Sequence, residues 1–152
     1  MEVRRIPSDS ADALALVAAM FAEIATLYPS LDDDPGPSAT PEDFSPPGGG
    51  FVALYDGGRA IAGGGIKRLE DGVGEVKRMY VVPASRGQGV ARRLLDALED
   101  LARDLGHARV RLDTGVHQHN ALTLYRSAGY SDIDDYNANP YANYWGEKRL
   151  GR

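Results

Sequence analysis

Residues 75–102 read EVKRMYVVPASRGQGVARRLLDALEDLA, and the rest of the chain is organised around them. A predicted strand, Val76 to Val82, is followed by a turn at Pro83-Ala84-Ser85, a glycine-rich run and an amphipathic helix. A glycine-rich turn that opens a helix leaves several backbone N–H groups without acceptors and directs them at one point. Because the positive end of the helix dipole adds to them, we predict a phosphate or diphosphate site at this turn.

Three anion-binding motifs can be compared with the glycine-rich run. The P-loop is excluded because no Lys-Ser/Thr pair follows the glycines. The dinucleotide fingerprint requires a small residue three positions after its second glycine, where this chain has Arg92. The pattern Arg/Gln-x-x-Gly-x-Gly/Ala is met by Arg86, Gly89 and Ala91. An ordinary glycine-rich loop between a strand and a helix is the alternative.

The composition indicates one domain of ordinary size. The 152 residues can bury a substantial core, and no apolar run approaches the ~20 residues that cross a bilayer. The absence of cysteine excludes disulfides, thiolate metal ligands and a cysteine nucleophile. A formal net charge of −5 disfavours a nucleic-acid partner, and no apolar signal segment follows the first residues. We therefore expect a cytoplasmic protein that binds neither nucleic acid nor membrane.

Two segments have the apolar spacing of amphipathic helices. In the first, which Ser8 or Ser10 could cap, the apolar face is predicted to consist of Leu14, Val17, Phe21, Ile24 and Leu27. In the second, it consists of Val90, Leu94, Leu98, Leu101 and Leu105, with Glu99 among the surface residues and Gly106 as the stop. A third, shorter helix is expected from Asn120 to Ala128, ended by Gly129.

Strand patterns separated by turn signals account for most of the remaining chain. Glycines 63–65 lie inside one of these strands, which indicates a bulge or a close backbone approach. Residues 28–50 contain six prolines and are predicted to form a long loop. The expected strands are 3–6, 51–55, 60–69, 73–82, 108–114, 130–136 and 144–150.

A second motif follows the glycine-rich turn at Asn120, Tyr125, Gly129 and Tyr130. With both motifs, the chain resembles the GCN5-related N-acetyltransferase (GNAT) family. The resemblance is strong over 75–129 and rests on the order of elements elsewhere. It implies a single α/β domain over residues 1–152, with a mixed sheet of six or seven strands and about four helices. It also implies transfer of the acetyl group of acetyl-CoA directly to a primary amine in a ternary complex.

The resemblance assigns the acetyl-CoA contacts to two parts of the chain. The strand before the turn would pair with the pantetheine arm, and the turn would hold the pyrophosphate. Asn120 would hydrogen-bond the cosubstrate as well as cap its helix. The implied cofactor-binding residues are Met79, Tyr80, Val81, Val82, Arg86, Gly87, Gln88, Gly89, Val90, Ala91, Arg92, Asn120 and Tyr125.

The resemblance also implies catalytic roles for Glu75 and Tyr125. Glu75 would accept a proton from the amine, directly or through water, because an ammonium is no nucleophile. Its alternative role is a surface ion pair with Lys77 or Arg78. Unbroken strand pairing would put Glu75, Met79 and Val81 on one face, with the Met79 N–H as the oxyanion donor. Tyr125 would protonate the leaving thiolate, and its alternative role is packing under its helix.

Acceptor contacts are expected from Tyr28, Arg78 and Tyr136, and from the acidic run at 32–34. A solvated loop and ordinary core packing are the alternatives for these positions. His117 and His119 have too few companions for a metal site and are expected on a surface loop. A homodimer is possible by resemblance. A non-catalytic acyl-CoA-binding or regulatory module is the competing function, and the acceptor amine is not readable from the sequence.

Overall fold

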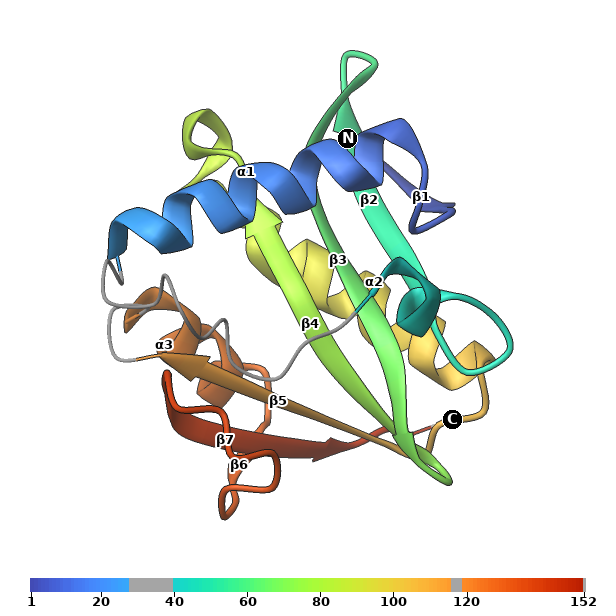
Figure 1. Cartoon of the computed structure of the whole chain (residues 1–152), viewed down its shortest axis with the longest axis vertical. Helices are drawn as coiled ribbons and strands as arrows, with labels where there is room; N and C mark the ends of the chain where they lie inside the picture. The colour runs from blue at the N-terminus through green and yellow to red at the C-terminus, as the bar shows by residue number, and fades with distance from the viewer. Residues whose placement is uncertain (28–39, 116–118, 152) are drawn as a thin grey trace.

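A computed structural model describes residues 1–27, 40–115 and 119–151 (Figure 1). One mixed seven-stranded sheet in the order β1-β2-β3-β4-β5-β7-β6 forms the centre. The strands are β1 (Glu2–Ile6), β2 (Gly50–Asp56), β3 (Arg59–Glu70), β4 (Val73–Val81), β5 (Arg109–Gly115), β6 (Ser131–Asp132) and β7 (Ala142–Arg149). The helices are α1 (Ala11–Leu27), α2 (Val90–Asp104) and α3 (His119–Ser127), with 3-10 turns η2 (Pro41–Phe44) and η3 (Pro83–Ser85). Within these described parts, no helix is both long and apolar enough to traverse a bilayer.

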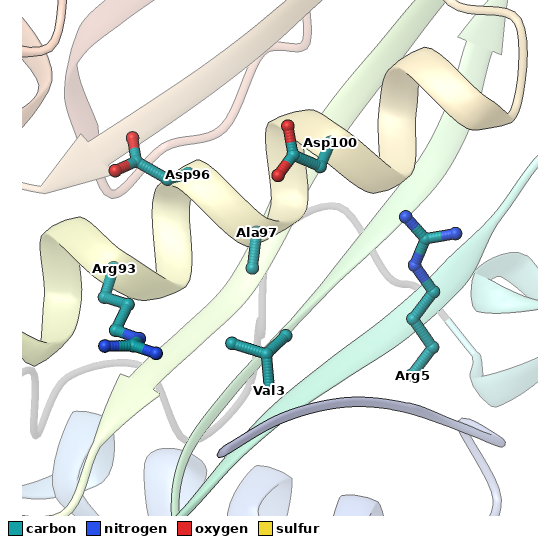
Figure 2. A pocket seen from close by; sticks show the side chains of 6 residues that line it. All are labelled: Val3, Arg5, Arg93, Asp96, Ala97 and Asp100. Carbon is teal, nitrogen blue, oxygen red and sulfur yellow. The ribbon is translucent and has the colours of Figure 1, made fainter. Parts of the chain in front are cut away.

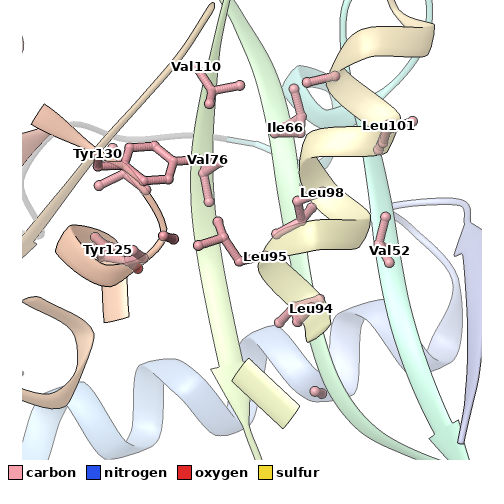
Figure 3. Close-up of a cluster of buried hydrophobic side chains, with 14 of the residues drawn as sticks. Val52, Ile66, Val76, Leu94, Leu95, Leu98, Leu101, Val110, Tyr125 and Tyr130 are labelled. Atoms are coloured by element: carbon pink, nitrogen blue, oxygen red, sulfur yellow. The ribbon is translucent and has the colours of Figure 1, made fainter. Parts of the chain in front are cut away.

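The helices cover both faces of the sheet. Figure 1 shows α1 crossing in front of the central strands and α2 running behind them. Leu94, Leu95 and Leu98 of α2 are fully buried in the larger core, which also includes Tyr125 and Tyr130 (Figure 3). The smaller core lies between α1 and the opposite face. The sheet is therefore the middle of three layers, with one core on each side.

The predicted spacing of α2 is confirmed, with one exception. Val90, Leu94, Leu98 and Leu101 are buried, as expected for the core-facing side. Glu99 was expected on the surface, but it is only 3% exposed. Its Oε1 accepts a hydrogen bond from Lys148 Nζ at 2.8 Å and its Oε2 one from the Tyr130 hydroxyl at 2.9 Å. Two residues distant in the chain, Tyr130 and Lys148 of β7, thus supply the partners that allow a carboxylate in this position.

The predicted apolar face of α1 is confirmed at Val17 and Ile24, which pack in the α1-side core, and is wrong at the other three positions. The buried side chains are Ala13, Leu16, Val17 and Met20, whereas Leu14, Phe21 and Leu27 are 46%, 50% and 40% exposed. The helix is apolar around most of its circumference, so spacing alone does not select a face. The sheet makes the selection, because Gly63 leaves room for Leu16: a Cβ on Gly63 would lie 2.7 Å from Leu16 Cδ1.

Glycines 63–65 confirm both readings of a glycine run in a strand. A Cβ added at Gly65 would come within 2.4 Å of the Phe44 ring, and one at Gly64 within 3.0 Å of Leu98. The register shifts at the same place: Gly65 pairs with Lys77, and Gly63 pairs with Tyr80. Two residues of β4, Arg78 and Met79, therefore lie opposite one residue of β3, which is a β-bulge.

The bulge reverses the direction of the following β4 side chains. Arg78 has φ +60°, an uncommon value for a residue with a side chain. Before the bulge, Val76 packs in the α2-side core; after it, Met79 and Val81 pack there, while Tyr80 packs in the α1-side core. Glu75 alternates with Val76 and so lies on the α1 side. The pairing is broken, so Glu75 does not share a face with Met79 and Val81.

The C-terminal part differs from the expected strands. The predicted strand 130–136 reduces to β6, because the chain leaves the sheet after Ile133 N–H donates to Trp145 O. The Asp135 carboxylate then accepts hydrogen bonds from the backbone amides of Asn137 and Ala138, at 3.0 and 2.7 Å. Such local side-chain bonds compete with strand pairing. The loop that results returns over the sheet toward Glu75.

Candidate active site

The glycine-rich turn has the backbone geometry of an anion cradle. Gly87 and Gly89 have φ values of +78° and +77°, and a Cβ added at either would meet no atom within 4 Å. Gly89 is the N-cap of α2, and its carbonyl accepts from Arg93 N–H at 3.2 Å. The amides between Gly89 and Arg93 lie in the first helical turn, where the helix itself offers no acceptors. The open space in front of the turn therefore faces backbone donors.

The side chain of Arg86 is directed at α1. Its guanidinium makes two hydrogen bonds to the Glu23 carboxylate, at 2.8 and 2.7 Å, and its Nε donates to Val81 O at 2.9 Å. Hydrogen bonding to Arg86 lowers the pKa of Glu23. The Arg86 backbone N–H donates to Pro83 O. This residue shapes the turn and joins it to α1.

The fork between β4 and β5 opens next to this turn. The two strands pair in parallel over three residues, from the pair Val73–Arg109 to the pair Glu75–Arg111. Beyond that point both strands continue, but they no longer pair with each other. Figure 1 shows them diverging. Glu75 is thus the last residue of β4 that pairs with β5, at the point where the gap between these two strands begins.

Glu75 lies in a dense polar environment. Its side chain is only 2% exposed. The Tyr136 hydroxyl donates to Glu75 Oε2 at 2.6 Å, Asn137 Nδ2 donates to the same oxygen at 3.3 Å, and Lys77 Nζ is 3.8 Å away. The structure therefore brings Glu75 and Tyr136 together. The contact between Glu75 and Lys77, predicted as a surface ion pair, instead lies within a cluster that has little solvent exposure.

Asp113 is a second carboxylate at the fork that sequence reasoning missed. Its Oδ2 accepts from Asn137 Nδ2 at 2.5 Å and from Asn139 Nδ2 at 3.3 Å, and Lys77 Nζ is 3.8 Å away. In the sequence, Asp113 alternates with apolar residues and reads as an outward-facing strand position. The available signal was the pair of asparagines at 137 and 139, whose side-chain amides can donate hydrogen bonds to a partly buried acid.

Tyr125 approaches the fork from the opposite face. It is buried in the α2-side core, and its hydroxyl donates to Met79 Sδ at 3.7 Å. Burial raises the pKa of Tyr125, so the phenol stays protonated at neutral pH. Tyr125 packs in the core and also reaches β4 at the bulge, so both readings of this residue fit its position.

The other predicted site residues are placed as follows. Arg78 lies between two aromatic rings, 5.5 Å from the Phe21 centroid and 4.9 Å from that of Phe44, and burial lowers its pKa. Asn120 is exposed as the second residue of α3, so that helix begins one residue before the expected cap. Tyr28, residues 32–34 and His117 lie outside the described residues.

Two further features do not belong to the fork. Among the described residues, no group of three potential metal ligands occurs. A hollow of about 260 Å³ lies between β1 and α2, and the lining residues are Val3, Arg5, Arg93, Asp96, Ala97 and Asp100 (Figure 2). Strands β2 and β3 separate β1 from β4 in the sheet, so this hollow is distinct from the fork.

Comparison with known proteins identifies the family. The model of the acetyltransferase (GNAT) family matches residues 17–130. The chain belongs to the GNAT family. This match includes β4, the glycine-rich turn and Tyr125. It therefore covers the residues on which the resemblance was based.

Individual GNAT relatives share both sequence and fold with this chain. An IAA acetyltransferase of Azospirillum brasilense is 42% identical over 83 residues, which are 54% of each protein. A Klebsiella pneumoniae structure assigned as an acyl-CoA N-acyltransferase is 32% identical with a TM-score of 0.76, covering 99% of this chain and 97% of that one. The structure of yncA from Salmonella typhimurium with acetyl-CoA is 18% identical with a TM-score of 0.69, covering 100% and 95%. The matched region spans 39% to 66% of the length of the curated relatives.

Proposed function

We propose that this GNAT protein is an N-acetyltransferase that moves the acetyl group of acetyl-CoA directly to a primary amine. The observation that carries the proposal is the arrangement at the β4–β5 fork. Glu75 lies on one face of the sheet where the fork begins, Tyr125 reaches β4 from the other face, and the glycine-rich turn follows β4. A base on the acceptor side and an acid on the thiol side suit direct transfer.

The residues at the turn fit a coenzyme diphosphate. The positive φ values and open space at Gly87 and Gly89 permit close approach of an anion to backbone amides. Beyond the part of β4 that pairs with β5, Val81 and Val82 would lie along the pantetheine arm. Acetyl-CoA supplies the activated thioester when bound. Asn120 and Arg92 would complete the contacts at the start of α3 and α2.

The chemistry of transfer divides among three groups. The Glu75 carboxylate would accept the proton that the ammonium must lose, directly or through water. The backbone N–H of Met79, within the bulge, would stabilise the negative charge that develops on the acetyl oxygen, an effect worth roughly 3 kcal/mol per donor. The Tyr125 hydroxyl would donate a proton to the departing sulfur. Arg78 and Tyr136 would line the acceptor side, and a homodimer stays a prediction from the family.

Acetyl-CoA-dependent thiol release with a panel of amines tests the proposal. We expect release with at least one amine class and a loss of about 10²–10⁴-fold in kcat/KM for Glu75→Gln. Acetyl-CoA affinity should stay within threefold of wild type. Glu42→Gln, an exposed carboxylate in η2, is the matched control and should retain wild-type activity. Coenzyme A binding without thiol release for any amine would instead identify a non-catalytic acyl-CoA-binding module.

A further inference from the structure

Two carboxylates with little solvent exposure, Glu75 and Asp113, lie at the fork. Glu75 is in register with Arg111, and Asp113 follows Arg111 by two residues, so both acids lie on the α1 side of the sheet. The Asp113 side chain is only 11% exposed. Past Glu75, the main-chain pairing of β4 and β5 has ended. Other groups must therefore fix the distance between the two acids.

The side-chain amide of Asn137 spans this gap. Its Nδ2 donates to Glu75 Oε2 at 3.3 Å and to Asp113 Oδ2 at 2.5 Å. Its Oδ1 accepts from Trp145 Nε1 at 2.9 Å and from the Asn139 backbone N–H at 3.2 Å. These contacts use both donors and both acceptor positions of the amide. Since Trp145 can only donate, the Asn137 oxygen must face β7 and the NH₂ must face the two acids.

Lys77 and Tyr136 complete the electrostatic balance. The Lys77 ammonium lies 3.8 Å from each acid, and the Tyr136 hydroxyl is a second donor to Glu75. Two carboxylates in a poorly solvated site repel each other unless donors and a cation offset them. Of these groups, only Asn137 hydrogen-bonds both acids.

We propose that Asn137 is a positioning residue that holds the Glu75 carboxylate at the fork by linking it to Asp113, with Trp145 setting the orientation of the amide. The role rests on the proposed function, in which Glu75 accepts the proton from the amine. Small displacements of a reacting group lower turnover steeply, even when ligand binding persists. Asn137 therefore acts on kcat through Glu75 and has no contact role toward acetyl-CoA.

An isosteric pair of substitutions separates positioning from space filling. Asn137→Asp keeps the shape of the side chain but replaces the NH₂ donor by an oxygen, which places a third carboxylate beside Glu75 and Asp113. Asn137→Ala removes the link without adding charge. A residue that only fills space would tolerate Asp better than Ala. If Asn137 positions Glu75 by donating hydrogen bonds, Asn137→Asp should lower kcat more than Asn137→Ala, because the third carboxylate repels the other two.

The experiment measures kcat and KM in the thiol-release assay, with thermal unfolding recorded for each variant. We expect kcat to fall about tenfold for Asn137→Ala and further for Asn137→Asp, with the KM for acetyl-CoA within twofold of wild type. Asn143→Ala, at an exposed asparagine of β7, is the control and should leave kcat unchanged. A kcat for Asn137→Asp equal to or above that of Asn137→Ala would overturn the proposal.

Trp145→Phe provides a second test of the proposal, which does not depend on the folding of Asn137→Asp. It keeps the aromatic ring but removes the N–H that orients Asn137. We expect it to lower kcat in the wild-type background and to have no further effect in Asn137→Ala. Losses that multiply in the double variant would overturn the proposal. If the wild-type protein releases no thiol with any amine, the proposed function itself fails. If the wild-type protein is active but kcat for Asn137→Asp is not below that for Asn137→Ala, only the role of Asn137 fails.

Discussion

Replacing Gly89 by alanine should weaken coenzyme binding more than its effect on folding explains. An added Cβ meets no atom within 4 Å, so the folding cost is that of a left-handed backbone at φ +77°, about 1–2 kcal/mol. In a chain of this size, each kcal/mol lowers Tm by roughly 2–4 °C, so a fall of about 2–8 °C is expected. The Cβ would occupy the space before the helix-start amides. We therefore expect the Kd for coenzyme A to rise at least about tenfold, or about 1.4 kcal/mol.

Gly72 provides the matched control for this prediction. It has φ +75°, an added Cβ there also meets no atom within 4 Å, and it lies in the turn between β3 and β4. Gly72→Ala should therefore lower Tm by a similar amount and leave the Kd unchanged. Thermal unfolding by circular dichroism gives Tm, and isothermal titration with coenzyme A gives the Kd. Equal affinity in the two variants would refute the backbone cradle at Gly89.

Three other perturbations test separate parts of the molecule. Tyr125→Phe should lower turnover about tenfold or more at unchanged acetyl-CoA affinity, and wild-type turnover would exclude its role as an acid. Lys148→Met leaves the buried Glu99 carboxylate without its cation and should lower the free energy of unfolding in urea by about 3 kcal/mol. Adding Glu99→Gln should restore most of this stability, and no recovery in the double variant would contradict the ion pair. Glu23→Gln should cost no more than about 1 kcal/mol at neutral pH, since its pair with Arg86 is partly exposed. Because Arg86 lowers the pKa of Glu23, that stability is present above about pH 4.5 and is lost as the pH falls through the lowered pKa, so the two proteins should converge in acid unfolding.

Local patterns predicted the elements around the turn correctly. The spacing of Val90, Leu94, Leu98 and Leu101 identified the buried face of α2, and Gly89 marked its start. The glycines at 63–65 indicated a bulge or a close backbone approach, and the structure has both at this place. In each case, the information lies within a few residues, because helical periodicity and the backbone freedom of glycine are local properties.

Predictions that required knowledge of the opposite surface were wrong. The face of α1 was misplaced because its sequence is apolar on several sides, and only packing against β3 selects Leu16 over Leu14. Glu99 was placed on the surface because its partner Lys148 is 49 residues away in the chain. The strand predicted after Tyr130 is short because the Asp135 side chain closes a turn that competes with the sheet.

The sequence by itself determined the family, the mixed α/β sheet and the position of the glycine-rich turn before α2. It also placed Glu75 on the strand before this turn and Tyr125 on a later helix. Only the tertiary structure decided that the bulge at Arg78 puts Glu75 on the opposite face from Met79, and that Asp113 and Asn137 adjoin it. The physical reason is that a strand's periodicity fixes alternation, whereas register shifts and the partners of buried charges depend on segments brought together by the fold.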